Sequence, residues 1–373
     1  SHKRFGTAKI ILEGREKEFG IPALDFATAR LEFYEHSAAL PEVERSSIKA
    51  DLHRRDFTIN TLAIRLVSRH YGQLLDFYGG ERDQRDKLIR VLHTLSFVED
   101  PTRILRAARL AQRLGFAIEG RTGELIDDAL GLLDRVTGPR LRHELELMLK
   151  EQSPAGIIQA LDELGVLQQL ERGLTYDRWL AGKLREIEQL PAGKWKTATY
   201  PAESEVETRA GARAEVDRKN LFLALLTYRL TKAQLERFLN RLRFSQDVGK
   251  LLREVKKLRS RAYRLDRPDL KPSQIYRLLH YFSPQAIMAF CIALDSAVGR
   301  ENVQLYLNQL RWVRPHIKGG FLKEQGIPAG PIYSRILDRL LYARLDGEVR
   351  TASEEEAMAK KLIATWRRRT SSK

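Results

Sequence analysis

Cysteine is almost missing from this chain of 373 residues, which contains a single one, Cys291. A lone thiol excludes an internal disulfide framework and a cysteine-rich zinc site. Cys291 lies in the apolar run at residues 287–294, so we expect a small buried hydrophobic side chain. This usage is typical of a reducing compartment, and we predict a cytoplasmic protein.

Long hydrophobic runs are missing as well. No apolar stretch is long enough to cross a bilayer, and the first residues do not show the pattern of a signal peptide. Hydrophobic residues nevertheless make up 43% of the chain, which is enough for packed cores. At about 100–200 residues per domain, we expect roughly two to four folded units and no membrane partner.

Acidic residues are in short supply, since 49 Asp and Glu face 65 Lys and Arg, which gives a net charge of +16. A surface this basic attracts polyanions, and nucleic acid is the first candidate. The same excess also fits a merely solvated surface, so charge alone leaves both readings open.

The apolar pattern changes along the chain from strands to helices. Residues 7–12 and 21–28 have short strand-like runs with turn residues between them, which predicts an antiparallel pair. Residues 33–48 predict a mobile loop, and apolar positions between 57 and 66 recur at helical spacing. Helical patterns dominate from about residue 100, apart from a long loop predicted at 191–213. Strands followed by helices favour an α+β fold.

The segment at residues 54–60 combines two guanidinium groups, a carboxylate and an amide. These belong to Arg54, Arg55, Asp56 and Asn60. Asp56 and Asn60 are four residues apart, so a helix would place them on one face. Guanidinium groups bind phosphate oxygens, and carboxylates and amides bind ribose hydroxyls, so a nucleotide would satisfy the whole set. A solvated helix start capped by Asp56 is the alternative.

A second segment begins at Asp100, which precedes Pro101 in a pattern typical of a helix start. Asp100 and Arg103 would project together from the first turn. A carboxylate accepts from the exocyclic amine of cytosine or adenine, and a guanidinium donates to the ring. The pair could therefore read C or A, with Arg106 and Arg109 completing a candidate nucleotide-binding set. An ion pair between Asp100 and Arg103 in a capped helix is the alternative.

In their order and spacing, the two segments resemble motifs of class II tRNA nucleotidyltransferases and bacterial poly(A) polymerases. Arg-Arg-Asp followed by Asn resembles the ribose-binding motif, and Glu-Asp followed by Arg resembles the amino-acid template that selects the nucleotide. Residues 2–8, 25–34 and 76–90 also resemble the head of this family, and 114–116 the end of its template helix. The resemblance covers residues 1–150 closely and the remainder loosely.

The resemblance implies a particular domain order. Residues 1–90 would form part of a small antiparallel-sheet nucleotidyltransferase head, incomplete at its N-terminus. A helical neck with the template motif would follow at 91–150, a helical body at 151–265 and a helical RNA-binding tail at 266–373.

The resemblance also implies an activity: addition of C and A, or only A, to tRNA 3′ ends from CTP and ATP, with release of pyrophosphate. Three carboxylates of the family hold Mg²⁺, and Asp25 matches the third, as a catalytic and metal-binding residue. The Asp-x-Asp pair that supplies the other two has no counterpart ahead of Phe5. Because one carboxylate rarely suffices for Mg²⁺, we expect this chain to be nearly inactive alone. The missing segment could belong to the same parent protein, come from a second chain or have been lost.

Two alternatives to the tRNA enzyme share this scaffold, namely a poly(A) polymerase and a non-catalytic RNA-binding module. All three have RNA as the partner. A run of basic residues between 250 and 264 has the spacing of a phosphate track on a helix. The predicted RNA-binding residues are Lys250, Arg253, Lys256, Lys257 and Arg261.

Overall fold

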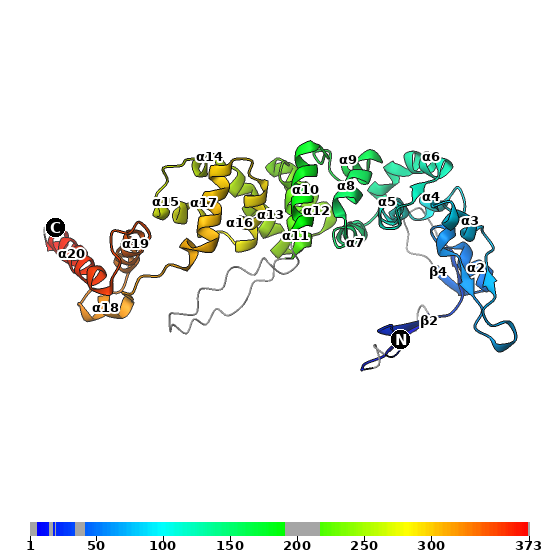
Figure 1. Cartoon of the computed structure of the whole chain (residues 1–373), viewed down its shortest axis with the longest axis horizontal. Coiled ribbons are helices and arrows are strands. Elements are labelled where there is room, and N and C mark those ends of the chain that lie inside the picture. The colour runs from blue at the N-terminus through cyan, green and yellow to red at the C-terminus, as the bar shows by residue number, and fades with distance from the viewer. Residues whose placement is uncertain (1–5, 15–17, 19, 34–41, 191–216, 372–373) are drawn as a thin grey trace. The chain divides into compact units, whose positions relative to one another are not determined.

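The computed structural model describes residues 6–14, 18, 20–33, 42–190 and 217–371. The loop predicted at 191–213 lies outside the described residues, as does the part at 34–41 of the loop predicted at 33–48. The chain divides into two compact units, Ser1–Asp177 with Glu236–Phe244, and Arg178–Leu235 with Ser245–Lys373. The finer division into four parts stays a prediction. Strands occur near the N-terminus and helices follow, which confirms the α+β class (Figure 1).

The strands are short and mostly pair as antiparallel neighbours. β1 (Thr7–Ile11) pairs with β2 (Ala23–Ala27), as predicted. The other antiparallel pairs are β3 (Arg30–Phe33) with β4 (Glu42–Arg45) and β5 (Ala63–Ile64) with β6 (Leu74–Leu75), while β7 (Leu88–Ile89) and β8 (Ala117–Ile118) are parallel. The predicted loop was therefore wrong at residues 42–45, because this segment pairs with β3.

The helix predicted across residues 57–66 was also wrong. Helix α2 (Ile48–His53) ends before this segment, a 3-10 turn η2 (Thr58–Asn60) occupies its start, and β5 takes its end. The Thr58 N–H donates to the carbonyl of Arg90 at 2.9 Å, and Phe57 forms an isolated bridge with Val91. Backbone groups that pair with the segment after β7 cannot form a continuous helix, although the apolar spacing is present.

The first unit continues as a set of helices around one apolar core. They are α3 (Gly80–Arg85), α4 (Ser96–Glu99), α5 (Thr102–Leu114), α6 (Gly120–Ala129), α7 (Gly138–Met148), α8 (Pro154–Glu163) and α9 (Val166–Leu170), with 3-10 turns η3 (Ser68–His70) and η4 (Leu130–Arg135). In α5, Ile104, Leu105 and Ala108 are fully buried. Gly115 ends this helix at φ 66°, a left-handed conformation that glycine adopts without strain.

Among its described residues, the second unit contains helices and connecting loops but no strand. Its elements are α10 (Arg178–Gln189), α11 (Arg218–Thr227), part of α12 (Lys232–Leu242), α13 (Gln246–Arg259), α14 (Ala262–Leu265), α15 (Pro272–Leu279), α16 (Pro284–Ala293), α17 (Ala297–Asn308), η5 (Leu310–Trp312), α18 (Gly319–Glu324), α19 (Pro331–Leu345) and α20 (Ala352–Ser371). Cys291 is buried in α16 as predicted, and burial raises the pKa of its thiol to about 11. Across the described residues, no helix is long and apolar enough to span a membrane.

Candidate nucleotide-binding site

Arg54 is held by two carboxylates at the end of α2. Its Nε and Nη2 donate to Asp51 Oδ1 at 3.1 and 2.8 Å, and its Nη1 donates to Glu32 Oε1 at 3.1 Å. Burial alone would raise the pKa of Asp51, but hydrogen bonds from Arg54 and from the backbone N–H of Arg30 lower it. Arg54 therefore joins α2 to β3. The neighbouring Arg55 remains half-exposed, 3.5 Å from Asp51.

Asp56 lies at the centre of the first motif and is buried. Its Oδ1 accepts hydrogen bonds from Phe57 N at 3.0 Å and Asn60 Nδ2 at 2.9 Å. Its Oδ2 lies 2.5 Å from Nη2 of Arg106 on α5. The expected helical face is replaced by the η2 turn, which nevertheless places Asn60 against Asp56. Arg106 brings the second motif to the first.

Arg103 forms a second junction between the two motifs. Its Nη2 donates to the carbonyl of Arg54 at 2.8 Å, and its Nη1 donates to Ser96 Oγ at 2.7 Å and Ser96 O at 3.3 Å. The residue is only 4% exposed. A buried guanidinium is tolerated when its donors are satisfied, and here backbone and hydroxyl oxygens satisfy them. Arg103 thus fixes α5 to α4 and to the turn after α2.

Asp100 precedes α5 in extended backbone (φ −136°, ψ 93°), and Pro101 after it is already helical (φ −62°, ψ −18°), so the Asp100 side chain caps the helix start as predicted. Asp100 Oδ1 accepts from Thr102 N at 3.0 Å and Thr102 Oγ1 at 2.6 Å. Arg103 approaches Glu99 at 3.7 Å and forms no ion pair with Asp100, so the simple pair within the helix is not formed.

Three arginine–aspartate pairs in this region share one arrangement. They are Arg55–Asp51 at 3.5 Å, Arg106–Asp56 at 2.5 Å and Arg140–Asp100 at 2.8 Å. The carboxylate side chains are 8, 6 and 17% exposed, whereas the guanidinium side chains are 43, 39 and 25% exposed. A guanidinium that binds one carboxylate oxygen keeps further N–H donors for another anion. Arg55 and Arg106 therefore offer positive donors above buried carboxylates, while Arg140 binds the less buried Asp100.

Arg109 faces the interior of the first unit. Its Nη2 lies 3.6 Å from Glu144 Oε2, and its Nη1 lies 3.3 Å from Glu151 Oε1. Burial raises the pKa of Glu144, while the charges of Arg106 and Arg109 oppose that change. With its side chain 14% exposed, Arg109 anchors α5 to α7 and the segment that follows it.

Sequence reasoning missed Arg140 and His93 here. Arg140 comes from α7, and no local pattern links it to Asp100. His93 stacks on His53 with ring centroids 5.3 Å apart, and its Nε2 lies 3.5 Å from Glu99 Oε2. Burial, with the charges of His53 and Arg103, lowers the pKa of His93 to about 4. A neutral histidine therefore packs beside the Arg103 junction.

Asp25 lies on β2, directly opposite Lys9 of β1. Lys9 Nζ is 3.6 Å from Asp25 Oδ1, and the Asp25 side chain is 74% exposed. Within the part of the chain that the structure describes, no three His, Cys, Asp or Glu side chains are grouped to hold a metal. Magnesium requires several oxygen ligands in a tight octahedron. The described residues alone therefore do not fit a resident Mg²⁺.

The predicted RNA-binding residues of α13 do not all face solvent. Lys250, Arg253 and Lys257 are exposed at helical spacing. Lys256 instead donates to the carbonyl of Leu230, and burial followed by the charge of Arg259 lowers the pKa of Lys256. The fifth predicted residue, Arg261, lies at the start of α14.

Two known protein families match segments of the first unit, and several known proteins match most of the chain. The family described as the poly(A) polymerase head domain matches residues 1–90, and the one described as the probable RNA- and SrmB-binding site of polymerase A matches 115–177. The A-adding tRNA nucleotidyltransferase of Geobacter sulfurreducens is 39% identical over 97% of this chain and 40% of its own length. That of Halalkalibacterium halodurans is 32% identical over 84% of this chain and 68% of its own length.

Solved structures show the same fold. A CCA-adding enzyme in apo form superposes with a TM-score of 0.79 and 33% identity, over 98% of this chain and 81% of that one. The Thermotoga maritima CCA-adding enzyme complexed with tRNA gives a TM-score of 0.71 at 32% identity, over 98% of this chain and 80% of that one.

The chain spans about two fifths of the length of the Geobacter relative and of the Aquifex aeolicus A-adding enzyme, for which the values are 40% and 38%. Identity above 30% nevertheless extends over most of the Halalkalibacterium halodurans relative and of the superposed CCA-adding enzymes. The chain belongs to the family of tRNA nucleotidyltransferases that contains the A-adding and CCA-adding enzymes.

Proposed function

We propose that this chain binds a nucleoside triphosphate, ATP in preference, and the 3′ end of a tRNA, as part of an A-adding tRNA nucleotidyltransferase. The observation that carries the proposal is the direct junction of the two motifs, in which Arg106 contacts Asp56 and Arg103 contacts the Arg54 backbone. This junction supports a single site in the first unit for the phosphate, ribose and base contacts.

Each part of a nucleotide has a counterpart in this arrangement. The half-exposed guanidinium groups of Arg55 and Arg106 suit the triphosphate. Asn60 gives its Nδ2 to Asp56, which leaves the amide oxygen to accept from a ribose hydroxyl. Asp100 uses Oδ1 for its protein contacts, so Oδ2 is left to accept from the exocyclic amine of adenine or cytosine.

The relatives favour addition of A alone. Three A-adding enzymes match 97, 89 and 84% of this chain, whereas the CC-adding enzyme of Deinococcus radiodurans matches 44%. The superposed structures include CCA-adding enzymes in complex with ATP and with CTP, so addition of both nucleotides is the second candidate. The two candidates share the same nucleotide contacts.

Nucleotide binding is the direct test of the site. Turnover would require Mg²⁺ at Asp25 together with further carboxylates, and these are not grouped among the described residues. We expect the chain to bind ATP more tightly than GTP and UTP in equilibrium dialysis. Asp100→Ala should abolish this preference, and Arg55→Ala should weaken the binding of all four nucleotides alike, because Arg55 pairs with Asp51 and not with the base-reading Asp100.

The matched control is Arg121→Ala, which removes an exposed arginine paired with Glu124 in the same unit. It should leave both affinity and preference unchanged. Equal affinity for all four nucleotides in the unaltered chain would refute the proposal. Tight tRNA binding without any nucleotide binding would instead support the non-catalytic RNA-binding module.

The length of the RNA product separates the remaining candidates in a preparation in which turnover is measured. A tRNA ending in CC should gain one A from ATP, and a tRNA lacking CC should gain nothing from CTP. Addition of C to the shorter tRNA would establish CCA addition. A long tract of A on either RNA would establish a poly(A) polymerase.

A further inference from the structure

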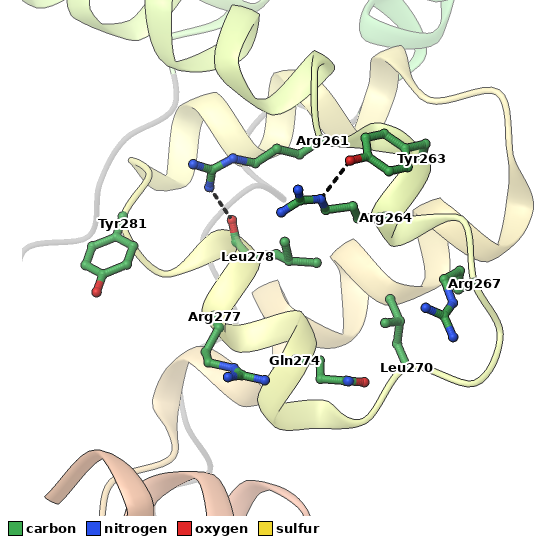
Figure 2. A pocket seen from close by; sticks show the side chains of 9 residues that line it. All are labelled: Arg261, Tyr263, Arg264, Arg267, Leu270, Gln274, Arg277, Leu278 and Tyr281. Atoms are coloured by element: carbon green, nitrogen blue, oxygen red, sulfur yellow. Dashed lines mark hydrogen bonds between the residues drawn. The ribbon is translucent and has the colours of Figure 1, made fainter. Parts of the chain in front are cut away.

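The second unit contains a pocket lined with arginine and tyrosine side chains, which extends from the end of the basic run at 250–264 to residue 281. It has a volume of about 650 Å³ and lies between α14 and α15, with walls from one continuous segment. The residues that matter are Arg261, Tyr263, Arg264, Arg267, Arg277 and Tyr281. Figure 2 shows Arg261 and Arg264 above α15, Arg277 on α15 itself and Arg267 on the loop between the helices.

The charge of this pocket is largely uncompensated. Arg267 pairs with Asp269 at 2.7 Å. Among the described residues, no carboxylate pairs with Arg261, Arg264 or Arg277. Arginines gathered without acids repel one another, and a polyanion relieves this repulsion. The arrangement therefore favours a ligand with more than one phosphate.

Neutral groups of the protein hold two of these guanidinium groups in place. Arg261 Nη1 donates to the carbonyl of Leu278 at 3.4 Å, and Arg264 Nε donates to the hydroxyl of Tyr263 at 3.0 Å (Figure 2). The guanidinium of Arg277 lies 5.3 Å from the centre of the Tyr342 ring. Each group is oriented by a contact that leaves other N–H donors for phosphate oxygens.

Aromatic rings lie at the edge of the pocket. Tyr263 and Tyr281 are 68 and 79% exposed, although both are large side chains. The Tyr281 ring is supported from behind, since its centroid lies 3.6 Å from that of His280, which stacks on Tyr276 at 4.8 Å. A supported and exposed ring is a platform for an unpaired base, because stacking then costs little side-chain entropy.

We propose that this pocket binds a bend of an RNA loop, with successive phosphates on Arg264 and Arg277 and an unpaired base on Tyr281. A paired duplex keeps its bases inside the helix, so only unpaired RNA can use the tyrosine. The inference rests on the proposed function for its partner, and adds a second RNA contact outside the nucleotide site. A free nucleotide is the competing ligand.

The experiment measures the affinity of the full chain for a tRNA transcript as salt is varied. Loss of two phosphate contacts in Arg264→Ala/Arg277→Ala should reduce the slope of log affinity against log salt by about 1.5. The charge-matched control is Arg335→Ala/Arg339→Ala, which removes two exposed arginines of α19 outside the pocket. The control should change the slope by less than half as much.

The tyrosine is tested separately. Tyr281→Ala should weaken tRNA binding by about 5- to 100-fold, whereas Tyr281→Phe keeps the ring and should bind as the unaltered chain does. A blunt RNA duplex should bind equally to all three proteins. Circular dichroism of each variant establishes that the helices are retained.

The outcomes are distinct for the two proposals. If the pocket and control variants show equal slopes of log tRNA affinity against log salt, the pocket does not bind RNA phosphates. The proposal of ATP binding in the first unit is not affected by that result. An unaltered affinity of Tyr281→Ala for tRNA overturns the base platform. A loss of ATP affinity in the pocket variant, with tRNA affinity unchanged, overturns the RNA assignment in favour of a free nucleotide. A chain that binds no RNA overturns this inference and the RNA part of the proposed function together.

Discussion

Replacement of Arg103 by alanine tests whether the nucleotide site depends on a buried guanidinium. The side chain makes three hydrogen bonds, to the Arg54 carbonyl and to the carbonyl and hydroxyl of Ser96. A hydrogen bond to a charged group contributes about 1.5–3 kcal/mol, but the three share one side chain and are not additive. We expect Arg103→Ala to cost about 3–5 kcal/mol, as in other cases where a buried charged partner is removed.

Arg103→Lys distinguishes the charge of residue 103 from the hydrogen bonds of its guanidinium group. Lysine keeps the charge, but a single ammonium cannot bridge Arg54 and Ser96 with a planar fork of donors. Its cost should fall near 2 kcal/mol, between those of the alanine variant and the unaltered chain. A purely electrostatic role for residue 103 would instead leave the lysine variant unchanged.

The assay must report on the first unit alone, because a chain with two units need not unfold in one step. Tryptophan fluorescence is unsuitable, since the tryptophans of the described residues, at 179, 312 and 366, lie in the second unit. Hydrogen exchange read by mass spectrometry resolves peptides from α5 and from residues 54–60. Their protection should fall by about 10²- to 10⁴-fold in Arg103→Ala, while α20 peptides remain unchanged.

Arg121→Ala is the control for this experiment, as it is for nucleotide binding. Exchange in Arg103→Ala that equals the control would refute the structural role. If the nucleotide preference were then lost without any change in protection, Arg103 would act on the base directly and not through the junction.

Three further predictions follow from other buried groups. The folded-state pKa of His93, about 4, is below its ordinary value of 6.5, so the unfolded chain binds more protons between these values. The stability of the first unit should therefore fall as pH drops from about 6.5 to about 4, by up to about 3 kcal/mol, and His93→Gln should remove this pH dependence of thermal unfolding. Gly138→Ala should destabilise by about 3 kcal/mol in a thermal shift assay, because a Cβ would lie 1.9 Å from the carbonyl oxygen of Arg241. Glu355 is fully buried, and its carboxylate lies 2.7 Å from the Arg344 guanidinium. Glu355→Gln should therefore lower the free energy of unfolding by about 3 kcal/mol, which limited proteolysis would detect as faster cleavage between α18 and α20.

The glycine and glutamate substitutions have matched controls in the chain. A Cβ added at Gly131 meets no atom within 4 Å, so Gly131→Ala should change the unfolding temperature little. Glu356 is the exposed neighbour of Glu355, and Glu356→Gln should leave proteolysis unchanged. Equal effects of a test variant and its control would contradict the packing argument in either case.

Local patterns predicted the elements whose hydrogen bonds are local. The start of α5 was placed within two residues and its end at Gly115, because helix capping and apolar spacing act within a few residues. The antiparallel pairing of β1 with β2 was likewise readable from a turn between two short runs. The helix expected at 57–66 failed because the decisive partners, Arg90 and Val91, are distant in sequence.

The candidate site shows the same division. Its motifs were recognised by their residues, yet Arg140 and His93 were missed because they reach the site from segments without a local signal. The pocket between α14 and α15 is a contrasting case, since all its arginines lie in one short segment of sequence. The sequence shows these arginines directly, but it does not show that they line a cavity. That arrangement distinguishes them from a basic segment that is simply exposed to solvent.

The arginines of α5 show why burial has to be known before roles are assigned. Arg103, Arg106 and Arg109 follow one another at three-residue spacing and are chemically alike. Their side chains are 5, 39 and 14% exposed, so only Arg106 can give donors to a ligand without leaving its protein contacts. The two covered arginines fix α5 between the first motif and α7, and this fixed helix holds Arg106 above Asp56. Affinity for a triphosphate should therefore depend on Arg106 through its own donors, and on Arg103 and Arg109 only through the position they impose on it.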